Sequence, residues 1–255
     1  MAKPYHAGGA LSIALTPLRH RAILWPERGK RMGEAELRGR RILISAGPTW
    51  VAIDAVRHLS NFATGRLGLE LAREAARRGA SATLLLGPSR LCVPDADRAA
   101  IDIREYTYFE ELHALVRQEV GSRRYDAFLH SAAVADYAPE PQEGKIRSGQ
   151  ETLLLRLHPL PKIVDEVKAL DPDILLVKFK LEVEVSREEL IRIAQESRAR
   201  SQADLIVAND RSTFTAAAHP ALILGPEGLL AEVSTKEELA RALLDQVARR
   251  LGSPR

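Results

Sequence analysis

The stretch from residue 41 to residue 79 constrains the fold most, because a long connection joins an apolar run to an amphipathic helix. Ile42, Leu43 and Ile44 form a continuous apolar run, typical of a strand buried on both faces of a parallel sheet. Leu67, Leu71 and Ala75 then recur at helical spacing, and Gly79 ends that pattern as a helix C-terminal glycine. About twenty residues separate the two elements, whereas a strand-to-helix connection usually takes ~2–6 residues. We therefore expect the connection to carry function.

This connection is rich in residues that suit contact with a phosphate group. Gly65 and Gly68 fall where the helix begins, so backbone N–H groups there could approach an anion, assisted by the helix dipole. Thr64 adds a hydroxyl donor and Arg66 a positive charge. The dinucleotide fingerprint G-x-G-x-x-G and the phosphate loop G-x-x-x-x-G-K-[ST] are both absent, because residues 46–49 read Ala-Gly-Pro-Thr. The alternative is that the glycines only allow close packing of helix against strand.

Beyond this stretch, strand and helix patterns alternate to the C-terminus. The alternation predicts an α/β fold, namely a Rossmann-like doubly wound, mostly parallel sheet with helices on both faces. We predict strands at 80–86, 101–103, 125–129, 152–157, 174–179 and 204–208, helices at 108–120, 161–170, 186–200 and 235–251, and a hairpin of residues 221–224 and 229–232. Residues 138–149 are punctuated by proline and glycine, which predicts a surface flap.

The first 38 residues lack this regularity. We expect residues 1–38 to be an N-terminal extension of unknown role, in which residues 11–15 and 22–25 could form short edge strands. Residues 39–255 contain no internal repeat or linker, so they are expected to form one nucleotide-binding domain.

Composition excludes several classes of function. The formal charge is only +3 and aromatic residues make up 5% of the chain, so we expect no nucleic-acid partner. No apolar run approaches the ~20 residues needed to span a bilayer, so we expect no membrane association. Cys92 is the only cysteine, which rules out an intrachain disulfide and a cysteine-based zinc site. A reducing, cytoplasmic location is therefore expected.

Polar residues gather where the predicted strands end, at 45–49, 131–137, 179–182 and 209–210. In an open α/β sheet these carboxyl ends form the ligand site. The groups include small residues for a flat ring, one carboxylate for ribose hydroxyls and cations for phosphates, without a catalytic triad, cysteine nucleophile or metal-ligand cluster. A nucleotide site fits this set best. Two alternatives stay open: a nucleotide-binding module without catalysis, and a Rossmann-type NAD(P)- or flavin-dependent reductase. The missing fingerprint, and Gly87-Pro88 where an acidic residue would end the second strand, oppose the reductase.

Seven segments, in register along the chain, make the sequence recognisable: AGPT (46–49), D-x-x-R-x-x-S-N-F-x-T-G-x-x-G (54–68), SAAVADY (131–137), GKI (144–146), PKIV (161–164), FKLE (179–182) and DLIVAND (204–210). On these segments the chain resembles phosphopantothenoylcysteine synthetase (phosphopantothenate–cysteine ligase) of coenzyme A biosynthesis, in a stand-alone form without the fused decarboxylase domain. The resemblance implies that a nucleoside triphosphate activates the carboxylate of 4′-phosphopantothenate as an acyl-nucleotide, with release of pyrophosphate. The amine of L-cysteine then displaces the nucleoside monophosphate.

The resemblance also implies roles for individual residues. Lys145 matches the flap lysine that closes on the triphosphate, and Asn61 the asparagine that holds the carbonyl of the acyl intermediate. Arg57 matches a residue that binds the phosphate or carboxylate of the pantothenate moiety, with an ion pair inside the loop as the alternative. Asp136 matches the ribose-binding acid. The remaining nucleotide-binding positions are Gly47, Thr64, Gly65, Gly68, Ala132, Ala133 and Phe179.

The sequence departs from the family pattern at one place. Many bacterial members that use CTP carry two lysines on the helix before the DLIVAND segment, where this chain has Ser197 and Ser201. Arg198 or Arg200 could substitute for them. We favour CTP as the nucleotide. ATP is the alternative, because the segments FKLE and NFATGR are similar to members that use ATP. The resemblance further implies Mg²⁺ bound with the triphosphate, no metal site made by the protein, and a homodimer whose active site lies near the subunit interface.

Overall fold

The structure is a computed structural model that describes residues 36–89, 91–140, 142–149 and 151–252. Residues 32–255 are assigned to one unit of the chain, and the description here concerns the described residues of that unit. The predicted strands at 11–15 and 22–25 lie outside the described residues. The boundary at 38/39 stays a prediction, but Leu37 already belongs to the domain, because it is fully buried and its N–H donates to the Arg78 carbonyl at 3.1 Å.

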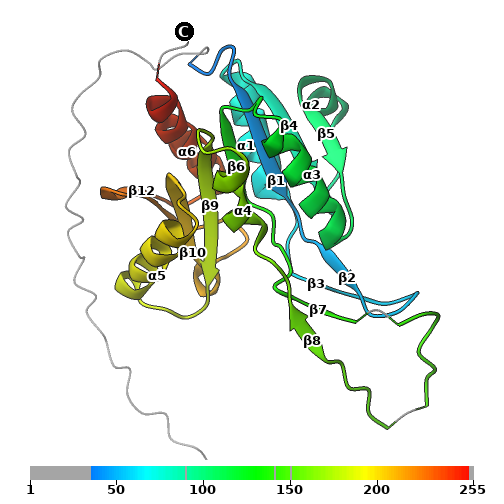
Figure 1. The fold of residues 1–255 in the computed structure, drawn as a ribbon. Coiled ribbons are helices and arrows are strands. Elements are labelled where there is room, and N and C mark those ends of the chain that lie inside the picture. The colour runs from blue at the N-terminus through cyan, green and yellow to red at the C-terminus, as the bar shows by residue number, and fades with distance from the viewer. Residues whose placement is uncertain (1–35, 90, 141, 150, 253–255) are drawn as a thin grey trace, which may run out of the picture. The chain divides into compact units, whose positions relative to one another are not determined.

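An eight-stranded sheet organises the domain, in the order β12-β11-β10-β9-β6-β1-β4-β5 (Figure 1). Its strands are β1 (Arg41–Ala46), β4 (Ser81–Leu86), β5 (Asp102–Glu105), β6 (Ala127–His130), β9 (Leu175–Glu182), β10 (Leu205–Asp210), β11 (Ala221–Gly225) and β12 (Gly228–Val233). The first six are parallel, and the hairpin β11–β12 extends the sheet antiparallel. From β1 the chain builds outward first through β4 and β5, then through β6, β9 and β10. The switch point therefore lies between β1 and β6.

Helices cover both faces of this sheet. Helices α1 (Arg66–Arg77) and α6 (Lys236–Leu251) pack on one face, together with Ile42 and Ile44 of β1. Leu43 points to the other face, which α3 (Phe109–Gly121), α4 (Ile163–Leu170) and α5 (Arg187–Arg200) cover. The remaining helical segments are α2 (Asp95–Ala100) and the 3₁₀ turn η1 (Arg211–Thr213). The predicted doubly wound α/β fold is confirmed, because successive residues of β1 are buried on opposite faces.

Local sequence signals set several helix ends as predicted. The hydroxyls of Ser186 and Thr235 accept hydrogen bonds from the N–H groups of Glu189 and Glu238, which begins α5 and α6. Gly79 has φ +84° just after α1, the left-handed conformation that a C-terminal glycine provides. None of the helices in the described ranges is both long and apolar enough to cross a bilayer.

Two small antiparallel ribbons were not predicted. They consist of β2 (Trp50–Ala52) with β3 (His58–Ser60), and β7 (Tyr137–Pro139) with β8 (Leu157–Pro159). Together with residues 142–149 they form an arm that extends from the carboxyl edge of the sheet (Figure 1). The predicted strand at 152–157 is wrong, since only residues 157–159 pair. Leu154 is 88% exposed, so the apolar alternation there does not face this domain's core.

Candidate functional site

The carboxyl ends of β1 and β6 join directly at the switch point. The Ser131 N–H and Oγ both donate to the Ser45 carbonyl, at 3.0 and 2.7 Å. The Ala133 N–H donates to the Gly47 carbonyl at 2.9 Å, and the Thr49 Oγ1 accepts from the Ala135 N–H at 2.9 Å. The segments predicted from AGPT and SAAVADY therefore form one floor, with the backbone of Ala132 and Ala133 above the sheet edge.

Three glycines let the start of α1 approach this floor. Gly65 has φ +73° and caps the helix, and a Cβ on it would lie 3.5 Å from the Gly47 nitrogen. Gly47, with φ +82°, has no room for a side chain beside the Gly87 backbone. A Cβ on Gly68 would lie 2.1 Å from the Cβ of Ala46. Gly68 is therefore required for packing, which was the alternative left open from the sequence. Thr64 is exposed and its Oγ1 accepts a long bond from the Arg66 N–H, 3.4 Å.

Asn61 lies over the floor. Its Nδ2 donates to the carbonyls of Ala133 and Val134, at 3.3 and 3.1 Å. No hydrogen-bond partner of its Oδ1 occurs within the described part of the chain. The amide is thus held in place by one end and presents its other end to a ligand.

A buried polar pair lies beneath the floor. The Ser45 Oγ and the Nδ1 of His130 share a hydrogen bond of 2.7 Å. Burial, reinforced by the nearby charge of Lys178, lowers the pKa of His130 to about 4, so the imidazole is neutral at pH 7. Tyr106 supports the same turn from below, because its hydroxyl donates to the carbonyls of Ala46 and Gly47, at 2.9 and 3.2 Å. These residues hold the floor in place and are not positioned to act on a ligand.

Asp136 is exposed and forms an ion pair with Lys162, the residue that precedes α4. The pair brings the predicted ribose-binding carboxylate next to a helix N-terminus, which favours anions.

Phe179 on β9 is partly buried and packs against the core on the α1/α6 face. Sequence reasoning quoted PKIV without assigning a role to Lys162. The signal available in the sequence was that Lys162 follows Pro161, a residue type that is common at the start of a helix.

Lys178 contacts Ser197 and Ser201, the positions where the family pattern has two lysines. Its Nζ donates to the Ser201 Oγ at 2.5 Å and to the Ser197 carbonyl at 3.3 Å, and lies 3.9 Å from Asp165. Burial lowers its pKa, although the Asp165 charge partly opposes the shift. No local pattern links this strand lysine with the two serines, because they lie 19 and 23 residues further along the chain.

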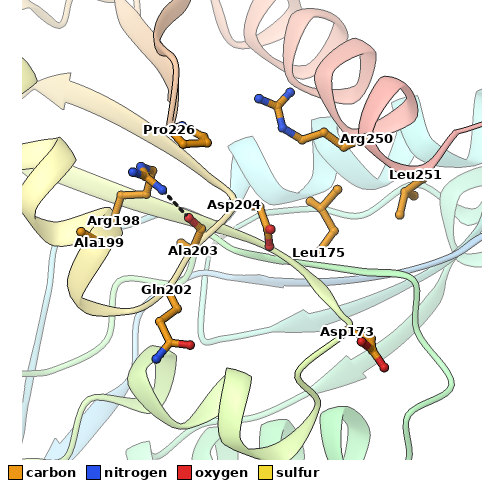
Figure 2. A pocket seen from close by; sticks show the side chains of 10 residues that line it. All are labelled: Asp173, Leu175, Arg198, Ala199, Gln202, Ala203, Asp204, Pro226, Arg250 and Leu251. Atoms are coloured by element: carbon orange, nitrogen blue, oxygen red, sulfur yellow. Dashed lines mark hydrogen bonds between the residues drawn. The ribbon is translucent and has the colours of Figure 1, made fainter.

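Arg198 lies elsewhere. It donates to the side chain of Gln195 at 2.8 Å and to the Ala203 carbonyl at 3.1 Å. Figure 2 shows it lining a pocket at the amino ends of β9 and β10, with Arg250 opposite. This pocket is at the opposite edge of the sheet from the switch point. The expectation that Arg198 could replace a site lysine is therefore not supported.

Arg57 and Lys145 lie on the arm. The Nη1 of Arg57 donates to Asp54 at 2.5 Å and to the Ile146 carbonyl at 3.3 Å, so the ion pair within the loop, the predicted alternative, does form. Its Nε and Nη2 have no partner in the described ranges. Lys145 is exposed and its ammonium likewise has no partner there. Within one chain the structure thus brings together Asn61, Gly47, Gly65, Gly68, Ala132 and Ala133, but none of their contacts joins them to Lys145 or Arg57.

The site offers amide, hydroxyl, ammonium and guanidinium groups, and no strong nucleophile. Across the described residues no group of three or more His, Cys, Asp or Glu side chains is placed to hold a metal ion. Such a site can bind and orient anions and can stabilise negative charge on phosphoryl or acyl oxygens.

Known proteins are similar to this chain over the region that contains these segments. Residues 37–251 match the family described as "DNA/pantothenate metabolism flavoprotein C-terminal domain". A coenzyme A biosynthesis bifunctional protein CoaBC from Thermococcus kodakarensis is 35% identical over 224 residues, which cover 87% of this chain and 54% of that protein. The chain thus spans about half the length of the curated relatives it matches.

Two solved structures share the fold. The DNA/pantothenate metabolism flavoprotein from Streptococcus pneumoniae superposes with a TM-score of 0.75 at 32% identity, covering 83% of this chain and 99% of that one. The C-terminal domain of a CoaBC protein superposes with a TM-score of 0.68 at 26% identity, covering 85% and 97%. The family match spans every element from β1 to α6, including the residues of the switch-point floor. The chain therefore belongs to the DNA/pantothenate metabolism flavoprotein C-terminal domain family.

Proposed function

We propose that this chain is a phosphopantothenate–cysteine ligase of coenzyme A biosynthesis, acting through an acyl-nucleotide. The observation that carries the proposal is the switch-point floor, where Asn61 is anchored over the Ala133 and Val134 carbonyls beside the glycine-lined start of α1. The ordered family segments and the relatives' role in coenzyme A biosynthesis support it. The site's lack of a nucleophile agrees with a reaction in which no covalent protein intermediate is needed.

The reaction has two steps. A carboxylate oxygen of 4′-phosphopantothenate attacks the α-phosphorus of the nucleoside triphosphate, and pyrophosphate leaves. The amine of cysteine then attacks the acyl carbon, the nucleoside monophosphate leaves, and the amine loses its proton. Lys145 and the N-terminal groups of α1 neutralise phosphoryl charge in the first step. Arg57 holds an anionic group of the pantothenate moiety.

Asn61 serves the second step. Its Oδ1 can accept a hydrogen bond from the attacking amine, and its Nδ2, once released from the two carbonyls, can donate to the acyl oxygen. Asp136 binds the ribose, for which its Oδ2 can accept hydrogen bonds while Oδ1 pairs with Lys162. We favour CTP over ATP as the nucleotide.

Mg²⁺ accompanies the triphosphate in this proposal. Because the described residues offer no cluster of acidic ligands, the ion would be held through phosphate oxygens, where it neutralises charge. A reducing cytoplasmic setting fits a chain with one cysteine.

The proposal includes a homodimer with the active site near the interface. The arm and the segments next to it carry large apolar side chains that a monomer would leave in water: Phe62 is 106% exposed, Leu154 88% and Val56 62%. A second copy that covers these side chains would also bring a second set of Arg57 and Lys145 to the assembly. Light scattering of the purified chain tests the dimer directly.

The test of the activity measures pyrophosphate release with 4′-phosphopantothenate and CTP or ATP, with and without cysteine. The proposal predicts release that needs phosphopantothenate, and amide product only when cysteine is present. Nucleotide binding without pyrophosphate release would support a binding module instead. Turnover that requires NAD(P)H would support a reductase.

A further inference from the structure

Asp54, at the tip of the β2–β3 ribbon, has a carboxylate whose two oxygens both accept hydrogen bonds from protein N–H groups. Its side chain is fully covered, and its two oxygens accept four hydrogen bonds. Three of them are local: Val56 N–H at 2.9 Å and Arg57 N–H at 2.8 Å on Oδ1, and Arg57 Nη1 at 2.5 Å on Oδ2. The fourth comes from the Ile146 N–H at 3.0 Å, 92 residues away.

That distant bond attaches the flap, residues 142–149, to the ribbon. Two backbone bonds join the same surfaces: Ala55 N–H to the Gly144 carbonyl at 2.9 Å, and Gln142 N–H to the Ile53 carbonyl at 3.2 Å. Lys145 lies between the two attached residues, Gly144 and Ile146. Its backbone is therefore fixed on both sides while its ammonium stays exposed.

The charge of Asp54 suits this role. Burial alone would raise the pKa of Asp54, but the N–H groups of Val56, Ile146 and Arg57 and the Arg57 guanidinium outweigh it, so the pKa lies below its ordinary value. The carboxylate is thus ionised at neutral pH and holds Arg57 and the flap with charge-assisted bonds. One covered anion thus binds Arg57 directly and attaches the flap that carries Lys145.

We propose that Asp54 is a positioning residue that holds Lys145 and Arg57 in the geometry required for nucleotide-dependent activation of the carboxylate. This inference rests on the proposed ligase function. It adds that the flap is preorganised by a side chain that does not touch the substrate. The chemical reason is that misplacement of a catalytic cation by about 1 Å can cost ~100-fold in rate.

The outcome of the first test does not depend on the ligase function. Asp54→Asn keeps the shape but places an amide N–H₂ where one oxygen accepts protein donors, so it weakens the attachment. Hydrogen exchange of the free protein should show faster exchange of the Ile146 and Ala55 amides, by about tenfold or more, with the sheet unchanged. Unchanged exchange at both amides would overturn the attachment itself, whatever the enzyme does.

The second test is kinetic and uses a mutant cycle. Asp54→Asn should lower kcat for pyrophosphate formation by about 10–100-fold and leave the KM for cysteine unchanged. Because Asp54 acts through Lys145 and Arg57, adding Asp54→Asn to a Lys145→Gln/Arg57→Gln variant should slow that variant by no more than about twofold. Fully multiplicative losses, or a wild-type kcat in Asp54→Asn despite faster exchange, would overturn the inference.

Two variants complete the design. Asp126→Asn breaks a comparable carboxylate, which binds Arg40 at 2.8 Å and the Arg41 N–H at 2.8 Å at the amino edge of the sheet, so it should leave kcat unchanged. Gly144→Ala strains the flap at φ +73° without a clash, and should lower kcat in the same direction if Asp54→Asn fails to fold. Wild-type protein that releases no pyrophosphate would refute the proposed function, while the exchange result would still decide the attachment.

Discussion

Gly68→Ala tests whether α1 is held against β1 by contact rather than by ligand binding. The added Cβ would lie 2.1 Å from the Cβ of Ala46, and ordinary contact begins at 3.4 Å, so helix and strand must separate by at least 1.3 Å. Overpacking of a rigid core costs roughly 1–3 kcal/mol, and a displacement of this size belongs at the upper end. Alanine returns about 1 kcal/mol through helix propensity. We expect a net loss of about 2 kcal/mol in the free energy of unfolding.

The assay is urea unfolding followed by circular dichroism, with thermal unfolding beside it. For a domain of this size, about 2 kcal/mol corresponds to a fall of ~4–8 °C in Tm. Ala46→Gly removes the obstructing methyl group, so the Gly68→Ala/Ala46→Gly pair should recover part of the loss that the two single variants would add up to.

Gly121→Ala is the matched control. Gly121 ends α3, and a Cβ on it would meet nothing within 4 Å, so this variant should be neutral or more stable by up to about 1 kcal/mol. Wild-type stability of Gly68→Ala, or strict additivity with Ala46→Gly, would refute the packing explanation.

Four further outcomes are expected. Asn61→Asp should retain pyrophosphate formation but lose amide formation, so that acyl-nucleotide accumulates in mass spectra; equal damage to both steps would contradict this division. Lys145→Gln should raise the activation free energy of the first step by about 2–4 kcal/mol. If the dimer shares its sites, mixing these two variants should restore up to about a quarter of wild-type activity, and no recovery after subunit exchange would argue against shared sites. Because the pKa of His130 is about 4 when folded and near 6.5 when unfolded, the unfolded chain binds the extra proton. Stability should then fall as pH drops from 6.5 to 4, by about 3 kcal/mol, and His130→Asn should flatten that decline in denaturant titrations.

The sequence predicted the parts of this fold that depend on periodicity. Continuous apolar runs such as residues 42–44 and 205–208 became strands buried on both faces, and capping residues such as Ser186 set the helix starts. It failed on the arm, where strands of three residues are too short to show a period. The strand predicted at residues 152–157 was wrong because apolar side chains there, such as Leu154, are exposed instead of facing a sheet.

The candidate site was predictable where it follows strand ends. Residues 45–49 and 131–137 were predicted at strand ends on one edge of the sheet, whereas their joining into one floor follows from the observed pairing of β1 with β6. The contacts of Asp54 with Ile146 and of Lys178 with Ser201 join segments that are 92 and 23 residues apart. No local pattern marks them, because each depends on how loops and helices pack.

The central claim is that this site makes a carboxylate reactive by transferring a nucleotide to it. Isotope tracing tests it most directly, with 4′-phosphopantothenate carrying ¹⁸O in both carboxylate oxygens, together with a nucleoside triphosphate and cysteine. The account predicts one ¹⁸O in the released nucleoside monophosphate, one in the amide carbonyl, and none in pyrophosphate. A nucleoside monophosphate without ¹⁸O, or label in phosphate or pyrophosphate, would contradict it.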